Sequence, residues 1–316
     1  MTDDGDVFVR SDGRPVTVVS GFRERVLGAR PSVTPRDGWS DDDYSGSADR
    51  KLARFARLRA EFEGRLGALE DARVLEMGCG DGINCLLFAH AGVGFVQGVD
   101  LAPGLLEDSD RGERARRLAD VVLGKVGFDR GHEAALAELP IDIRKMDATA
   151  LDLPDASFDL VWSRSVLEHV MPVDLALAEA VRVVRPGGLL HHRIDPFFGV
   201  RGCHKGGVVE IPWAHARMGL EDFRRFVAET EGEQKAVRRH TRLQTLNRLG
   251  TQVWRDLVVT GPVELLDWVE VRSELADEVL AEFPDLTADL LDGLTEHDLV
   301  FSELKAWLRR TPDTAG

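Results

Sequence analysis

The chain has 316 residues, which is enough for one large α/β domain with additions. Asp and Glu (55) outnumber Lys and Arg (40), so the formal net charge is −15. Such a field repels phosphate-rich polymers and anionic lipid, so we expect no nucleic-acid or membrane partner unless a local basic groove overrides it.

The N-terminal sequence gives no targeting signal. MTDDGDVFVR lacks a basic segment followed by an apolar one, and no stretch of about 18 apolar residues occurs elsewhere. Cys79, Cys85 and Cys203 form no C-x-x-C pair. These features predict a cytoplasmic protein that lacks a signal peptide and a membrane span.

The N-terminal part differs in composition from the rest. The first 45 residues are rich in Asp, Gly, Pro and Ser, which predicts a mostly irregular arm. Apolar residues at helical spacing then predict an amphipathic helix over 47–66 that packs on a sheet. We assign residues 1–69 to this arm and helix, and residues 70–316 to the main domain.

Strand-like and helix-like stretches alternate in the main domain. The expected strands are 73–76, 95–100, 141–146, 158–163 and 189–195, and the expected helices are 83–91, 109–124 and 172–184. A sharp turn at Arg185-Pro186-Gly187-Gly188 should introduce the fifth strand. The alternation predicts an α/β fold with a Rossmann-like, mostly parallel sheet and helices on both faces.

Residues 196–247 interrupt this alternation and read as a cap insertion with a helix at 220–230. The alternation of helix-like and strand-like stretches then resumes, with helices expected near 252–259 and 273–283 and strands near 263–271 and 299–308. These two strands bring the expected sheet to seven.

A glycine-rich loop, VLEMGCGDG at 74–82, follows the first strand of the main domain. Loops at this edge of an α/β sheet bind ligands, and glycine permits positive φ and close approach. The dinucleotide fingerprint needs a glycine where Ile83 stands. Glu76 and Asp81 also favour a cationic ligand over a pyrophosphate. A nicotinamide-dependent oxidoreductase is therefore only the alternative interpretation.

Further motifs make the resemblance specific. EMGCGDG (76–82), GVD (98–100), MDA (146–148), SFDLV (157–161) and RPGG (185–188) occur in fixed order. In that order and spacing the chain resembles class I S-adenosylmethionine-dependent methyltransferases over residues 70–195, and more weakly over 245–310. The resemblance implies S-adenosyl-L-methionine as the cofactor and methyl transfer as the reaction.

The resemblance also implies how the cofactor's methionine moiety is held. The loop would wrap this moiety through Gly78, Cys79, Gly80 and Gly82. Glu76 would lie beneath the loop, ordering it or reaching the ammonium through water. Tyr44 would close over the cofactor from the arm, although an exposed tyrosine without a role is the alternative.

The rest of the cofactor has its own set of expected partners. Asp100 would accept hydrogen bonds from both ribose hydroxyls, and Leu101 would pack on the adenine. Asp147 would accept the adenine amino group beside the Ala148 N–H, unless it is a plain turn cap. Ser163, at the end of the fourth strand, would line the methionine end.

Two groups of histidines are candidates for the base that methyl transfer to a hydroxyl requires. His169 ends the segment Ser165-Val-Leu-Glu168-His169. Some ubiquinone-pathway O-methyltransferases resemble this segment but carry Glu-x-x-Glu-His, which holds a divalent cation. Because Ser165 replaces the first acid, we predict no metal site here. Glu168 and His169 could equally be ordinary surface residues.

The second group lies at and beyond the fifth strand. His192 and Asp195 are candidate catalytic residues at its end, with His204 of the insertion as a possible base. Satisfied buried histidines and a metal site remain alternatives.

Missing motifs narrow the expected substrate. Ser163-Arg164-Ser165 replaces the Asn/Asp-Pro-Pro-aromatic loop of base- and glutamine-amino methyltransferases, and Cys203 does not follow a proline. The sequence therefore predicts a methyltransferase that acts on a hydroxyl, or less readily an amine, of a small molecule such as a sugar or secondary metabolite. A non-catalytic S-adenosylmethionine-binding protein is the further alternative.

Overall fold

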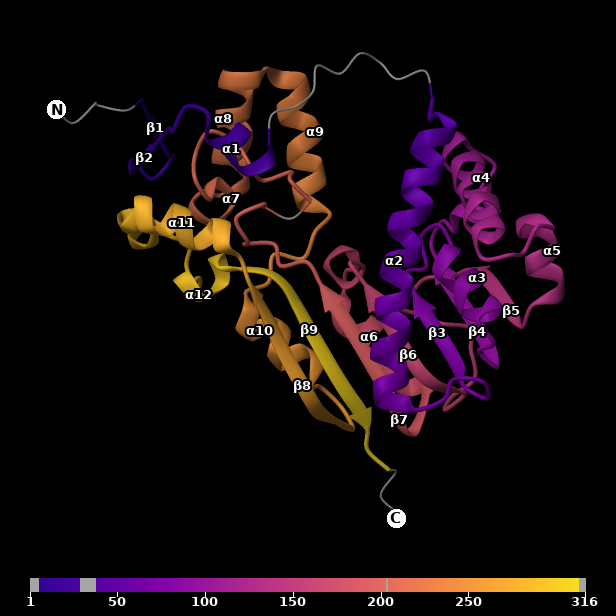
Figure 1. Ribbon diagram of the computed structural model, residues 1–316. Coiled ribbons are helices and arrows are strands. Elements are labelled where there is room, and N and C mark those ends of the chain that lie inside the picture. Colours follow the sequence, from indigo (N-terminus) through magenta and orange to yellow (C-terminus); the bar gives the residue numbers. More distant parts are fainter. Residues whose placement is uncertain (1–5, 29–37, 203, 313–316) are drawn as a thin grey trace.

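The computed structural model describes residues 6–28, 38–202 and 204–312. Parts of the predicted arm (1–5 and 29–37) and Cys203 lie outside the described residues. The main feature is a seven-stranded sheet in the order β5-β4-β3-β6-β7-β9-β8 (Figure 1). Its strands are β3 (Arg73–Met77), β4 (Phe95–Asp100), β5 (Ile141–Lys145), β6 (Phe158–Arg164), β7 (Val184–Ile194), β8 (Val263–Arg272) and β9 (Phe301–Arg310).

The sheet is parallel except at one strand. β5, β4, β3, β6 and β7 pair in parallel, whereas β9 is antiparallel to both β7 and β8. The predicted Rossmann-like, mostly parallel seven-stranded α/β fold is confirmed. Because the central strands share a direction, the loops after β3, β4, β6 and β7 leave the sheet at the same edge.

Helices cover both faces of the sheet. One layer contains α2 (Asp41–Leu66), α3 (Ile83–His90), α4 (Asp110–Lys125) and α5 (Gly131–Glu138), and the other contains α6 (Val173–Val183) and α10 (Thr251–Val258). Phe62 of α2 is fully buried, with Phe88, Trp162 and Trp307 at ring-centroid distances of 5.5–5.8 Å. This aromatic cluster anchors the long helix across the sheet (Figure 1).

The helix α2 begins earlier than the 47–66 expected from its apolar spacing. Ser40 is its N-cap and forms a capping box with Asp43. Three consecutive aspartates fill the first turn, where the positive end of the helix dipole stabilises them. The acidic segment predicted as part of the arm is therefore the start of a helix.

The prediction of a mostly irregular arm is wrong for residues 6–28. They form a hairpin of β1 (Val7–Val9) and β2 (Pro15–Thr17) followed by α1 (Phe22–Leu27). Phe8 packs edge-on against Phe226, with 5.3 Å between ring centroids. The Ser11 N–H donates to the Asp222 carboxylate at 3.0 Å. Packing on a distant part of the chain orders this segment, which local composition could not reveal.

The insertion 196–247 forms most of a cap with its own apolar core. It contains α7 (Ala214–Arg217), α8 (Leu220–Glu231) and α9 (Glu233–Gln244), of which only α8 was predicted. The same core includes residues of the arm and of α11 (Glu274–Glu282) and α12 (Glu296–Leu299). Figure 1 shows these elements grouped together above the upper ends of β8 and β9. Three separate stretches of sequence therefore build the cap.

One predicted turn lies inside a strand. β7 already begins at Val184, and the pairing shifts register between Phe158↔Val184 and Leu160↔Leu189. Gly187 adopts φ 78°, so the Pro-Gly segment forms an irregularity within the strand. Across the described ranges 6–28, 38–202 and 204–312, we find no helix with the length and apolarity that crossing a membrane would require.

Candidate active site

The glycine loop connects β3 to α3 in a conformation that needs glycine. Gly78, Gly80 and Gly82 have φ values of 74°, 57° and 74°. A Cβ atom on Gly78 would come within 2.3 Å of the Val166 side chain, and one on Gly82 within 2.9 Å of Leu105. The loop is therefore pressed against neighbouring segments while its backbone stays open to a ligand.

Glu76 lies beneath this loop and is 4% exposed. Its carboxylate accepts hydrogen bonds from Asn84 Nδ2 and Cys85 Sγ, both at 3.0 Å. Burial raises the pKa of Glu76 to about 8. These contacts tie the loop to the first turn of α3, and the role of Glu76 toward the cofactor remains a prediction. Cys79 is also buried behind the loop.

Asp100 ends β4 and joins two loops. Its Oδ2 accepts the Gly80 N–H and its Oδ1 accepts the Ala102 N–H, both at 2.9 Å. Each carboxylate oxygen retains further acceptor capacity for a diol. The neighbouring Leu101 side chain is 63% exposed, as expected of a surface that a planar ring could cover.

Asp147 follows β5 at the same edge. Its Oδ1 accepts the backbone N–H of Thr149 at 2.9 Å and the Thr149 hydroxyl at 2.8 Å. These bonds lower the pKa of Asp147. The contacts are those of a turn cap, the alternative considered from the sequence, and they leave the second carboxylate oxygen available.

These residues line one cavity of about 450 Å³. Six of the predicted cofactor residues lie in its wall: Gly78, Gly80, Asp100, Leu101, Asp147 and Ala148. The cavity is also lined by Arg164, Ser165, Val166 and His169, of which only His169 was a predicted site residue. We call this space the first cavity.

Five other residues were also predicted to contact the cofactor but do not line the first cavity: Tyr44, Glu76, Cys79, Gly82 and Ser163. Tyr44 is 4% exposed and packs between Trp39 and Arg117, whose guanidinium carbon lies 4.5 Å from the ring centroid. Ser163 is fully buried, and its Oγ lies 2.9 Å from His192 Nδ1. Their roles toward the cofactor remain predictions.

His192 itself is 1% exposed on the inner face of β7. Burial lowers its pKa to about 3, so the ring is neutral and weakly basic. Its Nε2 has no hydrogen-bond partner among the described residues. His191 points to the opposite face, where its ring stacks on Trp307 at 4.2 Å.

Three side chains converge beyond β6: Glu168, His169 and His204. The first two belong to the short 3-10 helix η2 (Leu167–His169), and His204 comes from the insertion. The two Nε2 atoms are 2.7 Å apart, and His204 Nε2 lies 3.6 Å from Glu168 Oε1. The imidazole rings stack with centroids 4.6 Å apart.

The carboxylate of this cluster is fully buried, which the sequence did not indicate. Within the described part of the chain neither Glu168 oxygen has a hydrogen bond. Burial raises the pKa of Glu168 and lowers that of His169, whereas the nearby Glu168 raises the pKa of His204. The three groups therefore depend on one another for their charge states.

Asn247, which sequence reasoning missed, fixes this cluster from the end of the insertion. Its Nδ2 donates to the carbonyls of Leu167 and Val170, at 2.8 and 2.6 Å. Its backbone N–H donates to the Glu168 carbonyl at 2.7 Å. The insertion thereby holds the η2 turn on both sides.

The cluster could supply metal-ligand atoms, since three donors lie within 4.8 Å of one another. Nitrogens that share a tetrahedral zinc ion, with bonds of about 2.0–2.1 Å, are about 3.3 Å apart. The 2.7 Å between the two Nε2 atoms instead fits a shared proton. In this arrangement the two nitrogens are too close together to be ligands of one tetrahedral zinc ion.

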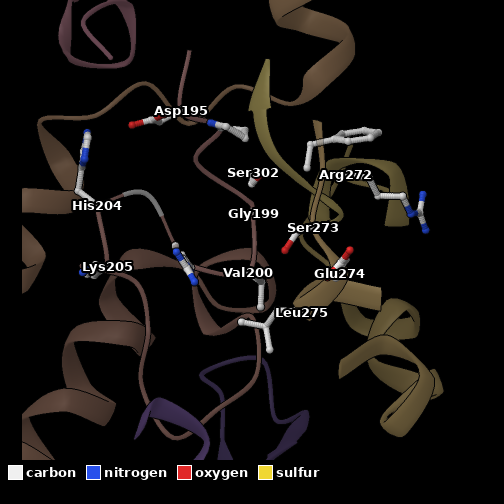
Figure 2. Close-up of a pocket in the computed structure, with 14 residues that line it drawn as sticks. Asp195, Gly199, Val200, His204, Lys205, Arg272, Ser273, Glu274, Leu275 and Ser302 are labelled. Atoms are coloured by element: carbon white, nitrogen blue, oxygen red, sulfur yellow. The ribbon is translucent and has the colours of Figure 1, made fainter. Parts of the chain in front are cut away.

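A second cavity, of about 630 Å³, is lined by His204 of this cluster. His204 and Asp195 form one side of it, and Ser273 and Glu274 lie across from them (Figure 2). Val200, Leu275 and Phe301 add apolar surface. This second cavity thus combines apolar walls with a few polar groups, as small-molecule sites do.

Comparisons with known proteins agree with this geometry. Residues 75–191 match the family described as "Methyltransferase domain". A 27-O-demethylrifamycin SV methyltransferase of Amycolatopsis mediterranei is 28% identical over 156 residues, covering 48% of this chain and 50% of that protein. A ubiquinone biosynthesis O-methyltransferase of Sinorhizobium medicae is 31% identical over 122 residues, covering 39% of this chain and 40% of that protein.

The chain thus spans about half the length, or less, of these curated relatives. Among solved structures, an S-adenosylmethionine-dependent methyltransferase from Mesorhizobium loti is 18% identical, with a TM-score of 0.45 over 84% of this chain and 100% of that one. The chain contains a class I S-adenosylmethionine-dependent methyltransferase domain, and the expected family and cofactor are confirmed.

Proposed function

We propose that this protein transfers the methyl group of S-adenosylmethionine to a hydroxyl of a small molecule. One observation carries the proposal: His169 lines the first cavity, His204 lines the second, and the two side chains are in direct contact. A base at such a contact lies where an attacking hydroxyl must meet the methyl group.

The first cavity has the groups that S-adenosylmethionine requires. The backbone of the glycine loop offers space for the methionine moiety, and Asp100 offers acceptor oxygens for the ribose diol. The exposed Leu101 and the Asp147–Ala148 segment would hold the adenine. When bound, the cofactor supplies an electrophilic methyl carbon on a sulfonium.

The chain's own task is to align the hydroxyl and take its proton. The hydroxyl oxygen forms a bond to the methyl carbon as the carbon–sulfur bond breaks, and the hydroxyl proton passes to His204. S-adenosylhomocysteine and a methyl ether are the products. The buried Glu168 stabilises the imidazolium as it forms, because the two groups lie 3.6 Å apart. Asp195, on the same cavity wall, adds a second negative charge that favours this cation.

His192 is a weaker candidate for the base. A pKa of about 3 gives it little tendency to take a proton near neutral pH, and it is 1% exposed. Its bond to Ser163 supports a structural role at the end of β6 and β7.

The choice of a hydroxyl acceptor has two supports. A neutral histidine paired with a carboxylate suits an acceptor that must lose a proton, and the relatives named above include O-methyltransferases. An amine remains the alternative acceptor. A protein that only binds S-adenosylmethionine remains the non-catalytic alternative, and the experiment below separates the two.

The test measures transfer of labelled methyl groups from S-adenosylmethionine to a set of phenols, sugars, secondary alcohols and amines. We expect His204→Gln to lower kcat by about 100-fold or more. Binding of S-adenosylhomocysteine should stay unchanged in this variant. His297→Gln removes an exposed histidine outside both cavities and serves as the matched control.

Two results would contradict the proposal. Unchanged kcat in His204→Gln would remove the assigned base. Tight cofactor binding without methylation of any hydroxyl or amine in the set would favour the non-catalytic alternative.

A further inference from the structure

A third cavity, of about 330 Å³, lies between α2 and the strands β6, β7 and β9. We call it the arginine cavity, because five cationic side chains line it: Arg54, Arg57, Arg164, Arg193 and Lys305. Only two carboxylates, Glu61 and Glu303, share its wall. Such a concentration of positive charge contrasts with a chain whose net charge is −15.

Both carboxylates of the arginine cavity already have partners. Glu303 pairs with Arg193, and its other oxygen lies 3.0 Å from Lys305 Nζ. Glu61 accepts the indole N–H of Trp307 at 3.1 Å. Two carboxylates therefore face five cations, and Glu303 is already engaged by two of them.

Arg164 shows the resulting imbalance. Its guanidinium forms neither an ion pair nor a hydrogen bond with any residue in the ranges 6–28, 38–202 and 204–312. Burial and the charges of Arg193 and Arg54 lower its pKa to about 10. The Nε of Arg193 is also buried without a partner among the described residues. Arg193 has Glu303 as its partner, whereas Arg164 has no carboxylate within ion-pair distance among the described residues, and the charge of Asp195 offsets only part of the effect of burial and repulsion.

The chemistry of the wall indicates what would supply that charge. Guanidinium groups bind carboxylate and phosphate through two parallel hydrogen bonds, and several of them around one space favour such an anion over chloride. Trp162 and His191 form an aromatic part of the wall. A volume of about 330 Å³ exceeds that of a lone carboxylate and leaves room for part of a carbon skeleton.

The position of the arginine cavity links it to the proposed reaction. Arg164 lines both this cavity and the first cavity. Arg193 lies on β7 two residues before Asp195, which lines the second cavity. An anion held here would lie at the edge of the sheet from which the methyl group is transferred.

We propose that the arginine cavity binds a carboxylate or phosphate group of the methyl acceptor, so that the acceptor is an anionic small molecule. This inference rests on the proposed methyl transfer. The methionine carboxylate of the cofactor is the other source of the same chemistry. Four of the five cations line the arginine cavity but not the first cavity, which favours the acceptor.

The experiment uses inorganic phosphate as the probe, with the full chain saturated with S-adenosylhomocysteine and the ionic strength held constant with chloride. We expect a saturable rise in Tm with phosphate. The double variant Arg54→Gln/Arg57→Gln should weaken phosphate binding at least fivefold, because both side chains line the arginine cavity. Arg59→Gln, on the same helix but paired with Glu63, should bind phosphate as the unchanged protein does.

A second measurement separates the two sources of the anion. Binding of S-adenosylhomocysteine and of 5′-methylthioadenosine, which lacks the methionine carboxylate, is compared by calorimetry. We expect the double variant to bind both within about twofold of the unchanged protein. A tenfold loss for S-adenosylhomocysteine alone would assign these cations to the cofactor and overturn the proposal.

The absence of a saturable phosphate response, or an equal response in the double variant, would also overturn it. Failure of the proposed function would look different. The unchanged protein would then bind phosphate but not S-adenosylhomocysteine.

Discussion

Replacing Gly78 with alanine tests whether the glycine loop is shaped by close packing. The new Cβ would lie 2.3 Å and 2.5 Å from the two methyl groups of Val166 and 3.0 Å from its Cβ. The two methyl groups of Val166 cause the severe overlap, whereas its Cβ, at 3.0 Å, needs a shift of only a few tenths of an ångström. The φ of 74° at Gly78 adds a separate backbone cost.

The magnitude follows from these two terms. A left-handed φ costs a non-glycine residue about 1–2 kcal/mol. Overpacking costs about 1–3 kcal/mol. We therefore expect Gly78→Ala to lower the free energy of unfolding by about 2–5 kcal/mol. Adding Val166→Ala should restore the overpacking part but not the backbone part.

Urea denaturation of the single and double variants measures both terms. Gly124→Ala is the matched control, because this glycine lies in α4 without a positive φ, and a methyl group added to it would meet nothing within 4 Å. The control should be neutral or slightly stabilising. A cost below about 0.5 kcal/mol for Gly78→Ala, or no recovery in the double variant, would refute the packing argument.

Three further predictions concern the cofactor and the base. Asp100→Ala should weaken S-adenosylhomocysteine binding at least 100-fold in calorimetry, because hydrogen bonds from two hydroxyls to a carboxylate are worth about 1.5–3 kcal/mol each. Asp152→Ala, which removes an exposed acid outside the first cavity, is the control. Equal affinities of the two variants would contradict the assignment. The acidic limb of the kcat/KM pH profile should lie above pH 6.5, because the base must be unprotonated and Glu168 raises the pKa of His204. Glu168→Gln should move this limb to lower pH. An unmoved limb would show that Glu168 does not act on the base. Dialysis against EDTA should leave methyl transfer unchanged, because the 2.7 Å between the His169 and His204 nitrogens fits a shared proton. Activity that is lost to EDTA and restored by a divalent cation would instead show that the cluster binds a metal ion.

The sheet could be predicted because its signals are local. Apolar runs bounded by Gly and Asp located β4 at its observed limits, and the five motifs placed the cofactor cavity through residues such as Asp100. The N-terminal hairpin could not be found in this way. Phe8 is ordered by Phe226, more than 200 positions away, and composition carries no trace of that contact.

The candidate site was predicted in the same uneven way. His169 and His204 were both named from the sequence, but their direct contact depends on Asn247 and the fold of the insertion. The sequence left Glu168 as a possible surface residue, whereas it is fully buried. Burial of a carboxylate is set by long-range packing, for which an isolated sequence segment has no periodic signal.

The shared core of the cap has a consequence for protein engineering. Residues 6–28, the insertion and the α11–α12 region contribute to one apolar interior, so none of them is an independent module. A chimaera that exchanged 196–247 alone between relatives would lose contacts such as Phe8 on Phe226 and Ser11 on Asp222. Transplanting the cap therefore requires three sequence segments to be moved together. During synthesis the cap can be completed only after the α11–α12 region has left the ribosome.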